Sequence, residues 1–145
     1  MRESGPWTYA FVNLAHVLGI STLFGSILVL DLRLVGIGRR VPLAALTVAV
    51  VPVATAGFLL AATTGVGLLA TKATEYVGNP FLFIKFPAIA LGLLNVGVLK
   101  QTAAWRAHRS RDLTAAEQRQ LAVFGGLSLL CWLTAITAGR MIAYW

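Results

Sequence analysis

Four long runs of apolar residues alternate with short polar connectors along the chain. We place these runs at about residues 8–30, 42–70, 80–100 and 120–144. About 20 apolar residues in a helix cross the hydrocarbon core of a bilayer, so each run is long enough to span. Pro52 lies inside the second run and predicts a kink there, whereas Pro80 suits the first turn of the third. The pattern predicts an all-α integral membrane protein, a single four-helix bundle over residues 1–145.

Basic residues mark the orientation of this bundle. Eight of them follow the first and third runs: Arg33, Arg39, Arg40, Lys100, Arg106, Arg109, Arg111 and Arg119. The two ends and the middle connector hold Arg2, Lys72 and, nearby, Arg140. Because Lys and Arg gather on the cytoplasmic side of membrane proteins, we expect both termini to face away from the cytoplasm of a bacterial inner membrane.

The third connector, from Gln101 to Gln118, has room for a short helical extension. Asp112 or Thr114 would then cap the next helix ahead of Glu117. His108 lies among the arginines of this connector, so we read it as solvated or facing lipid.

Composition narrows the class of protein further. Of 145 residues, 58% are hydrophobic and 12% charged, and the mean hydropathy is +0.80. Four spans leave no room for a soluble nucleotide-binding, protease or nucleic-acid module. We therefore attribute the net charge of +7 to the basic residues that orient the protein in the membrane, and we expect no nucleic-acid partner. A lone cysteine, Cys131, excludes an internal disulfide and a covalent haem attachment motif.

Three ionisable residues fall inside the predicted spans, where charge is costly unless it is paired or hydrated. They are His16, Lys85 and Arg140. At 1.5 Å per residue, they lie roughly 13, 8 and 7 Å below the outer boundary. All three therefore fall in the outer half of the membrane, on three different helices.

This shared depth suggests a cofactor site. Helical side chains lean toward the N-terminus of their helix, so Lys85 and Arg140, on antiparallel helices, lean toward each other. His16 would lie beneath them. That arrangement suits haem b, with His16 on the iron and the two cations on the propionates. A quinone or a lipid head group fits the same geometry. A helix-to-helix hydrogen bond for His16 and snorkelling cations are the alternatives.

Two asparagines share helix faces with these residues. Asn95 follows Lys85 on one stripe of the third span, and Asn13 precedes His16 on the first. We therefore add Asn13 and Asn95 to the candidate cofactor-binding residues.

Asp31 ends the first span together with Arg33. We interpret Asp31 as a structural anchor that pairs with Arg33 or with a basic residue of another helix.

The segments "AHVLGISTLFGSILVLDLRLVG" (residues 15–36) and "NPFLFIKFPAIALGLLN" (residues 79–95) resemble a group of small, uncharacterised bacterial four-helix membrane proteins. That group is distantly similar to copper-resistance-D type domains and to HemJ-type membrane protoporphyrinogen oxidases. The latter have a histidine early in helix one and a lysine early in helix three, which correspond to His16 and Lys85. The resemblance implies a haem-b-binding bundle that exchanges electrons with a quinone or another membrane complex.

Two departures from these relatives matter. A single histidine lies in the predicted membrane region, so two histidine ligands to one haem are not available within one chain. The second ligand would be Lys85, a water, a residue from a neighbouring protomer, or nothing. The richer histidine content of the copper-transport relatives is also missing, which argues against copper transfer.

The sequence therefore leaves three functions open. The first is haem b binding near the outer leaflet, for membrane electron transfer or for porphyrin or quinone redox chemistry; no catalytic residue is assigned. The second is a non-catalytic subunit or scaffold of a larger membrane complex, whose basic face meets anionic lipid or a partner. The third is a small transporter or copper-handling protein, which four short spans would form only as a homo-oligomer.

Overall fold

A computed structural model of the chain describes residues 5–145 and consists of four long helices joined by short connectors. The long helices are α1 (Pro6–Val35), α2 (Leu43–Thr71), α4 (Pro80–Gln101) and α6 (Ala115–Met141). All four are long and apolar enough to cross a membrane, which confirms the predicted all-α bundle. Shorter elements lie in the connectors and at the end of the chain: α3 (Ala73–Tyr76), α5 (Ala103–Ala107) and the 3₁₀ turn η2 (Ile142–Tyr144).

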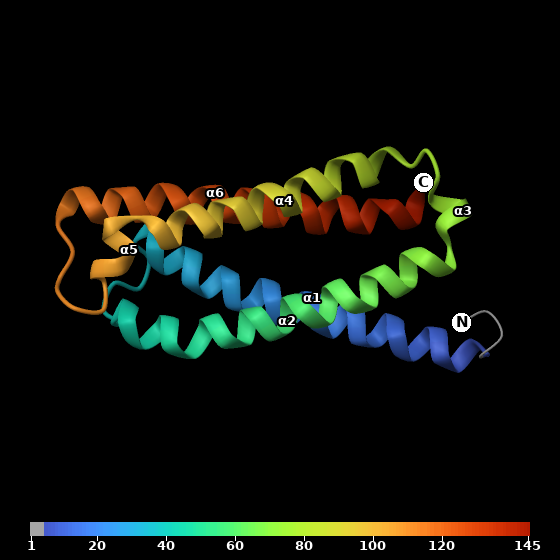
Figure 1. Cartoon of the computed structure of the whole chain (residues 1–145), viewed down its shortest axis with the longest axis horizontal. Coiled ribbons are helices and arrows are strands. Elements are labelled where there is room, and N and C mark those ends of the chain that lie inside the picture. Colours follow the sequence, from blue (N-terminus) through green and yellow to red (C-terminus); the bar gives the residue numbers. More distant parts are fainter. Residues whose placement is uncertain (1–4) are drawn as a thin grey trace.

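The helices form two antiparallel pairs that lie side by side. α1 packs along α2 and α4 along α6, while contact between α1 and α6 joins the two pairs. Figure 1 shows α5 and the α1–α2 connector at one end, which we call the basic end. It shows α3, the start of α1 and the C-terminus at the other, which we call the terminal end.

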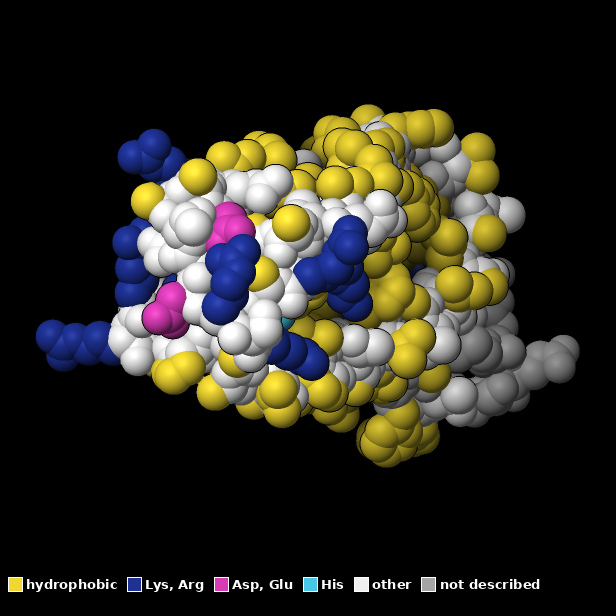
Figure 2. Space-filling view, turned by 60° about the vertical axis from the view of Figure 1, so that its left-hand side comes forward, with side chains coloured by type: hydrophobic (Ala, Val, Ile, Leu, Met, Phe, Trp, Pro, Cys, Tyr) yellow, Lys and Arg dark blue, Asp and Glu magenta, His cyan; other side chains and the backbone are white. Residues whose placement is uncertain are grey.

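Basic and apolar side chains occupy different parts of the surface, as expected of a membrane protein. Lys and Arg side chains gather over the basic end, which comes forward in Figure 2, and apolar side chains cover much of the visible flank. Many large apolar residues are exposed on the helices; Phe83 is 75% exposed and Val66 69%. Such a surface is expected where lipid tails surround the helices.

Glycine allows α1 and α2 to cross at close range. A Cβ added at Gly19 of α1 would lie 2.6 Å from the backbone nitrogen of Ala61. A Cβ added at Gly57 of α2 would lie 2.6 Å from the backbone nitrogen of Leu23. Real Cβ atoms do not come this close to backbone, so both glycines are required for the crossing in Figure 1.

Side chains satisfy free backbone groups at the starts of α4, α5 and α6. Thr114 accepts a hydrogen bond from the backbone of Glu117, and Glu117 accepts one from the backbone of Thr114, which is a complete capping box. Of the two predicted caps, Thr114 is confirmed, and α6 begins at residue 115 instead of near 120. Glu117 also pairs with Arg111, and this hydrogen bond raises the pKa of Arg111.

Asn79 connects α4 to the end of α6 at the terminal end of the bundle. Its side chain accepts from the backbone N–H of Phe81 and so caps α4, with Pro80 at the first position as predicted. The amide nitrogen of Asn79 donates to the carbonyl of Ile142, beyond the end of α6. Asn79 is only 1% exposed, so it fixes the start of α4 against the end of α6.

The apolar core has two parts along the bundle. Near the basic end, Leu34, Leu43, Leu99, Ala104 and Leu121 pack together from five helices. Nearer the middle, Trp132 of α6 packs with Leu23 and Ile27 of α1. The indole ring of Trp132 also covers Gly92 of α4, where an added Cβ would lie 3.1 Å from the ring. Trp132 therefore joins three helices through packing.

Candidate functional site

His16 reaches from α1 to α2 inside the half of the bundle nearer the terminal end. Its Nδ1 lies 3.0 Å from the hydroxyl of Thr64. That hydroxyl donates its single proton to the carbonyl of Leu60 at 2.5 Å, so toward His16 it acts as an acceptor. With the hydroxyl proton directed to Leu60, Nδ1 is the atom that carries the imidazole proton. In the neutral ring this leaves Nε2 with its lone pair, ready to bind a metal or accept a proton.

Gly65 provides the space for the His16 ring. A Cβ at this position would lie 2.9 Å from Cε1 and 3.4 Å from Nδ1 of His16. The ring therefore rests on the bare backbone of α2, one residue beyond its hydrogen-bonding partner Thr64. Packing and hydrogen bonding together hold the imidazole in one orientation, as is typical of metal-binding histidines.

Lys85 enters the same region from α4. Its ammonium group runs over Gly139 of α6, where an added Cβ would lie 3.4 Å from Nζ. Lys85 also lies near enough to His16 to act electrostatically on the imidazole. The structure thus brings two of the three predicted ionisable residues together, from helices α1 and α4. Thr64 and Gly139 line the pair from α2 and α6.

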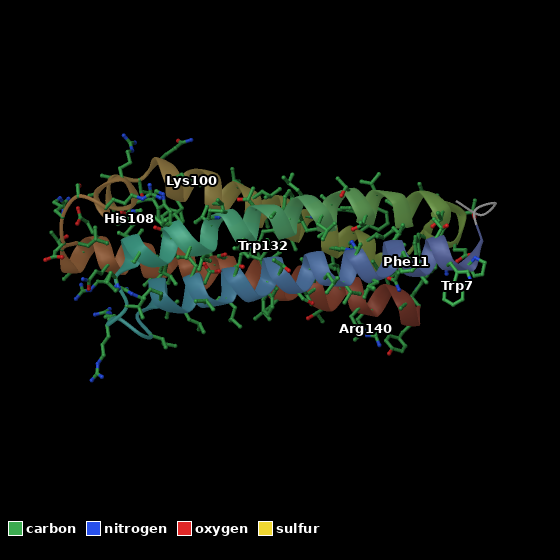
Figure 3. The ribbon with its side chains drawn as sticks, turned by 90° about the horizontal axis from the view of Figure 1, so that it is seen from below. Trp7, Phe11, Lys100, His108, Trp132 and Arg140 are labelled. Carbon is green, nitrogen blue, oxygen red and sulfur yellow. The ribbon has the colours of Figure 1, made fainter. Side chains whose placement is uncertain are left out.

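Arg140 does not join this pair. It lies on the exposed side of α6, and its guanidinium donates to the hydroxyl of Tyr144 at 2.7 Å and lies over the Tyr144 ring. Figure 3 shows Arg140 projecting outward near the terminal end. The expected convergence of Lys85 and Arg140 is wrong because adjacent positions on α6 point about 100° apart: Gly139 faces Lys85, which turns Arg140 outward.

The two asparagines also lie apart from His16 and Lys85. Asn13 is exposed on α1, although it is one turn from His16. Asn95 donates its amide hydrogen to the carbonyl of Phe124 at 3.0 Å and so ties α4 to α6. This bond accounts for Asn95 by helix packing alone.

Asp31 and Arg33 take separate partners. Asp31 is 4% exposed and meets the side chain of Ser128 on α6. Arg33 donates to the carbonyl of Val41 at 2.8 Å and so holds the α1–α2 connector. The expected ion pair between them is not formed, because neighbours two apart on a helix point to nearly opposite sides.

His108 is docked on the bundle instead of being solvated. Its Nε2 lies 3.2 Å from the hydroxyl of Thr47, which is fully buried, and its ring packs on Trp105 at 4.5 Å between centroids. His108 therefore fastens α5 to the start of α2. It lies toward the basic end in Figure 3, together with Lys100 and far from Arg140.

Sequence reasoning missed two residues that position His16. Thr64 and Gly65 are small and occur in a run rich in similar residues, so no pattern marks them. A signal existed only for Thr64: a hydroxyl in an apolar helix needs a partner, and His16 needed one on another helix.

Searches against protein-family models, curated proteins and solved structures each find no match for this chain. The site must therefore be interpreted from its own chemistry. It offers one imidazole held by Thr64 and one half-buried ammonium group, inside a bundle of helices able to span a membrane. This set can coordinate a single metal centre and bind an anionic or carbonyl oxygen beside it.

Proposed function

We propose that the protein is a bacterial inner-membrane haem protein that serves electron transfer. His16 would hold the iron of a haem b, and Lys85 would hold one of its propionates. Both termini lie outside the cytoplasm, which places this site near the outer leaflet. The proposal rests on one observation above all: the Thr64 hydroxyl lies 3.0 Å from Nδ1 of His16 and 2.5 Å from the carbonyl of Leu60, an arrangement that favours a proton on Nδ1 and a lone pair on Nε2.

The surroundings of His16 fit a haem ligand. Metal-binding histidines donate their second N–H to a protein oxygen, which sets the tautomer and makes the ligand more basic. Thr64 supplies that oxygen, and the bare backbone at Gly65 admits the ring. A haem held this way supplies one-electron exchange; the chain supplies the ligand, its orientation and an apolar surround.

Lys85 suits a carboxylate partner. Among residues 5–145, no acidic side chain forms an ion pair with its ammonium group, and Lys85 is half-buried beside Gly139. An ammonium held in an apolar bundle gains most from a charge-assisted hydrogen bond to an anion. Arg140, which pairs with Tyr144, has no part in this site.

A quinone is the second candidate ligand for the same pair. Lys85 would donate to one quinone oxygen, and the free Nε2 of His16 would accept a proton from the reduced form. The observation favouring it is that both groups are polar and interact electrostatically within a bundle whose helices are able to span a membrane. In either case the electron partner is another membrane redox component.

The test is a visible spectrum of the full-length protein, purified in detergent after expression with haem precursor. Wild type should show a Soret band and, when reduced, an α band. His16→Ala should lose both. His108→Ala is the matched control, because it removes the other histidine, near the basic end, and should keep the spectrum.

Thr64→Val provides a second variant that keeps the ligand. It removes the oxygen that orients His16 and should lower haem affinity by about 10–100-fold. A folded but colourless wild-type protein would overturn the haem proposal. Quinone retained by wild type and lost in His16→Ala would then support the second candidate, and copurifying membrane proteins would support a scaffold.

A further inference from the structure

A second polar site lies at the contact between α1 and α6, separate from His16 and Lys85. Asp31 of α1 faces α6 between Ser128 and Gly125, and only 4% of its surface is exposed. A Cβ at Gly125 would lie 3.0 Å from the backbone oxygen of Asp31. α6 therefore passes directly over the aspartate, and Ser128 is its hydrogen-bonding partner.

One oxygen of this carboxyl group has no partner. Among residues 5–145, the buried side-chain atoms without a hydrogen bond are Oδ2 of Asp31 and Nε1 of Trp132. Trp132 lies one turn beyond Ser128 on α6 and is itself 5% exposed. Its N–H can only donate a hydrogen bond, whereas the free carboxyl oxygen of Asp31 can accept a proton. Oδ2 of Asp31 is therefore the atom of this interface that can accept a proton.

The charged groups around Asp31 do not neutralise it. On α1, Arg33 is engaged with the carbonyl of Val41. The sequence of α2 contains no charged residue, and that of α6 has none between Arg119 and Arg140. On α4, Lys85 lies beside Gly139, and Lys100 is exposed at the basic end.

The chemistry of the site selects its ligand. A bare carboxylate inside a bundle that spans a membrane costs several kcal/mol, and binding a cation removes that cost. A metal ion needs about six oxygen ligands, and no three His, Cys, Asp or Glu side chains gather anywhere in residues 5–145. A proton needs only one free oxygen. Ser128 fits both states, because a hydroxyl donates to a carboxylate and accepts from a carboxylic acid.

We propose that Asp31 is a proton-binding site inside the bundle: its buried carboxyl group takes up a proton at the unpartnered Oδ2 and exchanges that proton when the contact between α1 and α6 opens. The leucine cluster around Leu34 and Leu121 lies between Asp31 and the basic end. Exchange with water on that side therefore requires these helices to separate, which makes the exchange slow.

Infrared spectroscopy of the full-length protein in liposomes tests this directly. Wild type at neutral pH should show the carbonyl band of a protonated carboxylic acid, which shifts in deuterated water. Asp31→Asn should lose the band. Asp112→Asn is the matched control, because Asp112 is exposed in the α5–α6 connector and should leave the band unchanged.

A stability comparison keeps the test independent of the band assignment. Asn has nearly the shape of a neutral Asp, so Asp31→Asn should keep the folded fraction of wild type at neutral pH, whereas Asp31→Leu, which cannot bond Ser128, should lower it. Absence of the acid band in wild type, or its survival in Asp31→Asn, would overturn the proposal. So would stabilisation of wild type by added sodium at fixed pH. None of these outcomes depends on haem or quinone binding.

Discussion

Gly65 and His16 lie so close that a single methyl group on the glycine would come within 2.9 Å of Cε1 of the imidazole. Gly65→Ala should therefore displace the ring and weaken its bond to Thr64. We expect a loss of about 1–3 kcal/mol in unfolding free energy, as for other overpacked sites, and reduced haem content. The measurement is haem per protein after purification. Gly25→Ala on α1 is the control, since an added Cβ there meets no atom within 4 Å.

The crossing of α1 and α2 should be equally sensitive. Gly57→Ala places its methyl group 2.6 Å from the backbone nitrogen of Leu23. A backbone atom within a helix cannot move aside by a rotation of its side chain. We expect a loss of about 1–3 kcal/mol or more, measured by unfolding in mixed micelles. Gly126→Ala on α6 faces open space and should change stability little. Equal stability of both variants would show that the helices do not cross here.

Lys85 and Arg140 should differ in their effect on the cofactor. Lys85→Met removes the ammonium near His16 and should lower haem or quinone retention about tenfold, a typical loss for one charge-assisted bond. Arg140→Met breaks only the contacts with Tyr144 and should leave retention unchanged. Ligand loss during dilution measures both. A larger effect of Arg140→Met would instead support the arrangement expected from the sequence, in which Lys85 and Arg140 bind the same ligand.

Asn95 should act on stability alone. Asn95→Ala removes the bond to the carbonyl of Phe124 and should cost about 1 kcal/mol, the usual value between membrane helices. The visible spectrum should stay that of wild type. Thermal unfolding measures the loss of stability, and the visible spectrum of the same sample checks that the cofactor site is unchanged. A changed spectrum with unchanged stability would instead place Asn95 at the cofactor.

Labelling from outside the cell tests the orientation. In a Cys131→Ser background, Thr74→Cys reports on the terminal end and Ser110→Cys on the basic end, because both positions are exposed. If the basic end is cytoplasmic, a membrane-impermeant maleimide should label Thr74→Cys in intact cells and Ser110→Cys only after lysis. The reverse pattern would invert the bundle.

Sequence reasoning predicted the spans well but not the rotation of each helix. Long apolar runs and clustered arginines are unambiguous signals for spans and ends. Rotation is harder, because lipid is as apolar as the bundle interior and the helices carry no strong polar face. Arg140 and Asn13 are the results: each lies within its predicted helix but on an exposed side.

What fixes the rotation is close backbone packing at a few glycines. Gly19 and Gly57 set how α1 lies on α2, and this brings His16 to Thr64 and Gly65. The chain has 14 glycines, and nothing in their spacing distinguishes these two from Gly25 or Gly126, which meet no neighbour. Three-dimensional contact, which a single sequence does not display, separates them.

The placement of Asp31 under α6 links the stability of the first helix to the synthesis of the last. α1 leaves the ribosome about 90 residues before Ser128 and Gly125 are made. Until then, the acid that they cover in the finished bundle faces lipid or the insertion machinery. A chain stopped before α6 would leave the Asp31 carboxyl group without this cover, which is costly inside a membrane. Asp31 thus makes the stability of the first helix depend on completion of the final span.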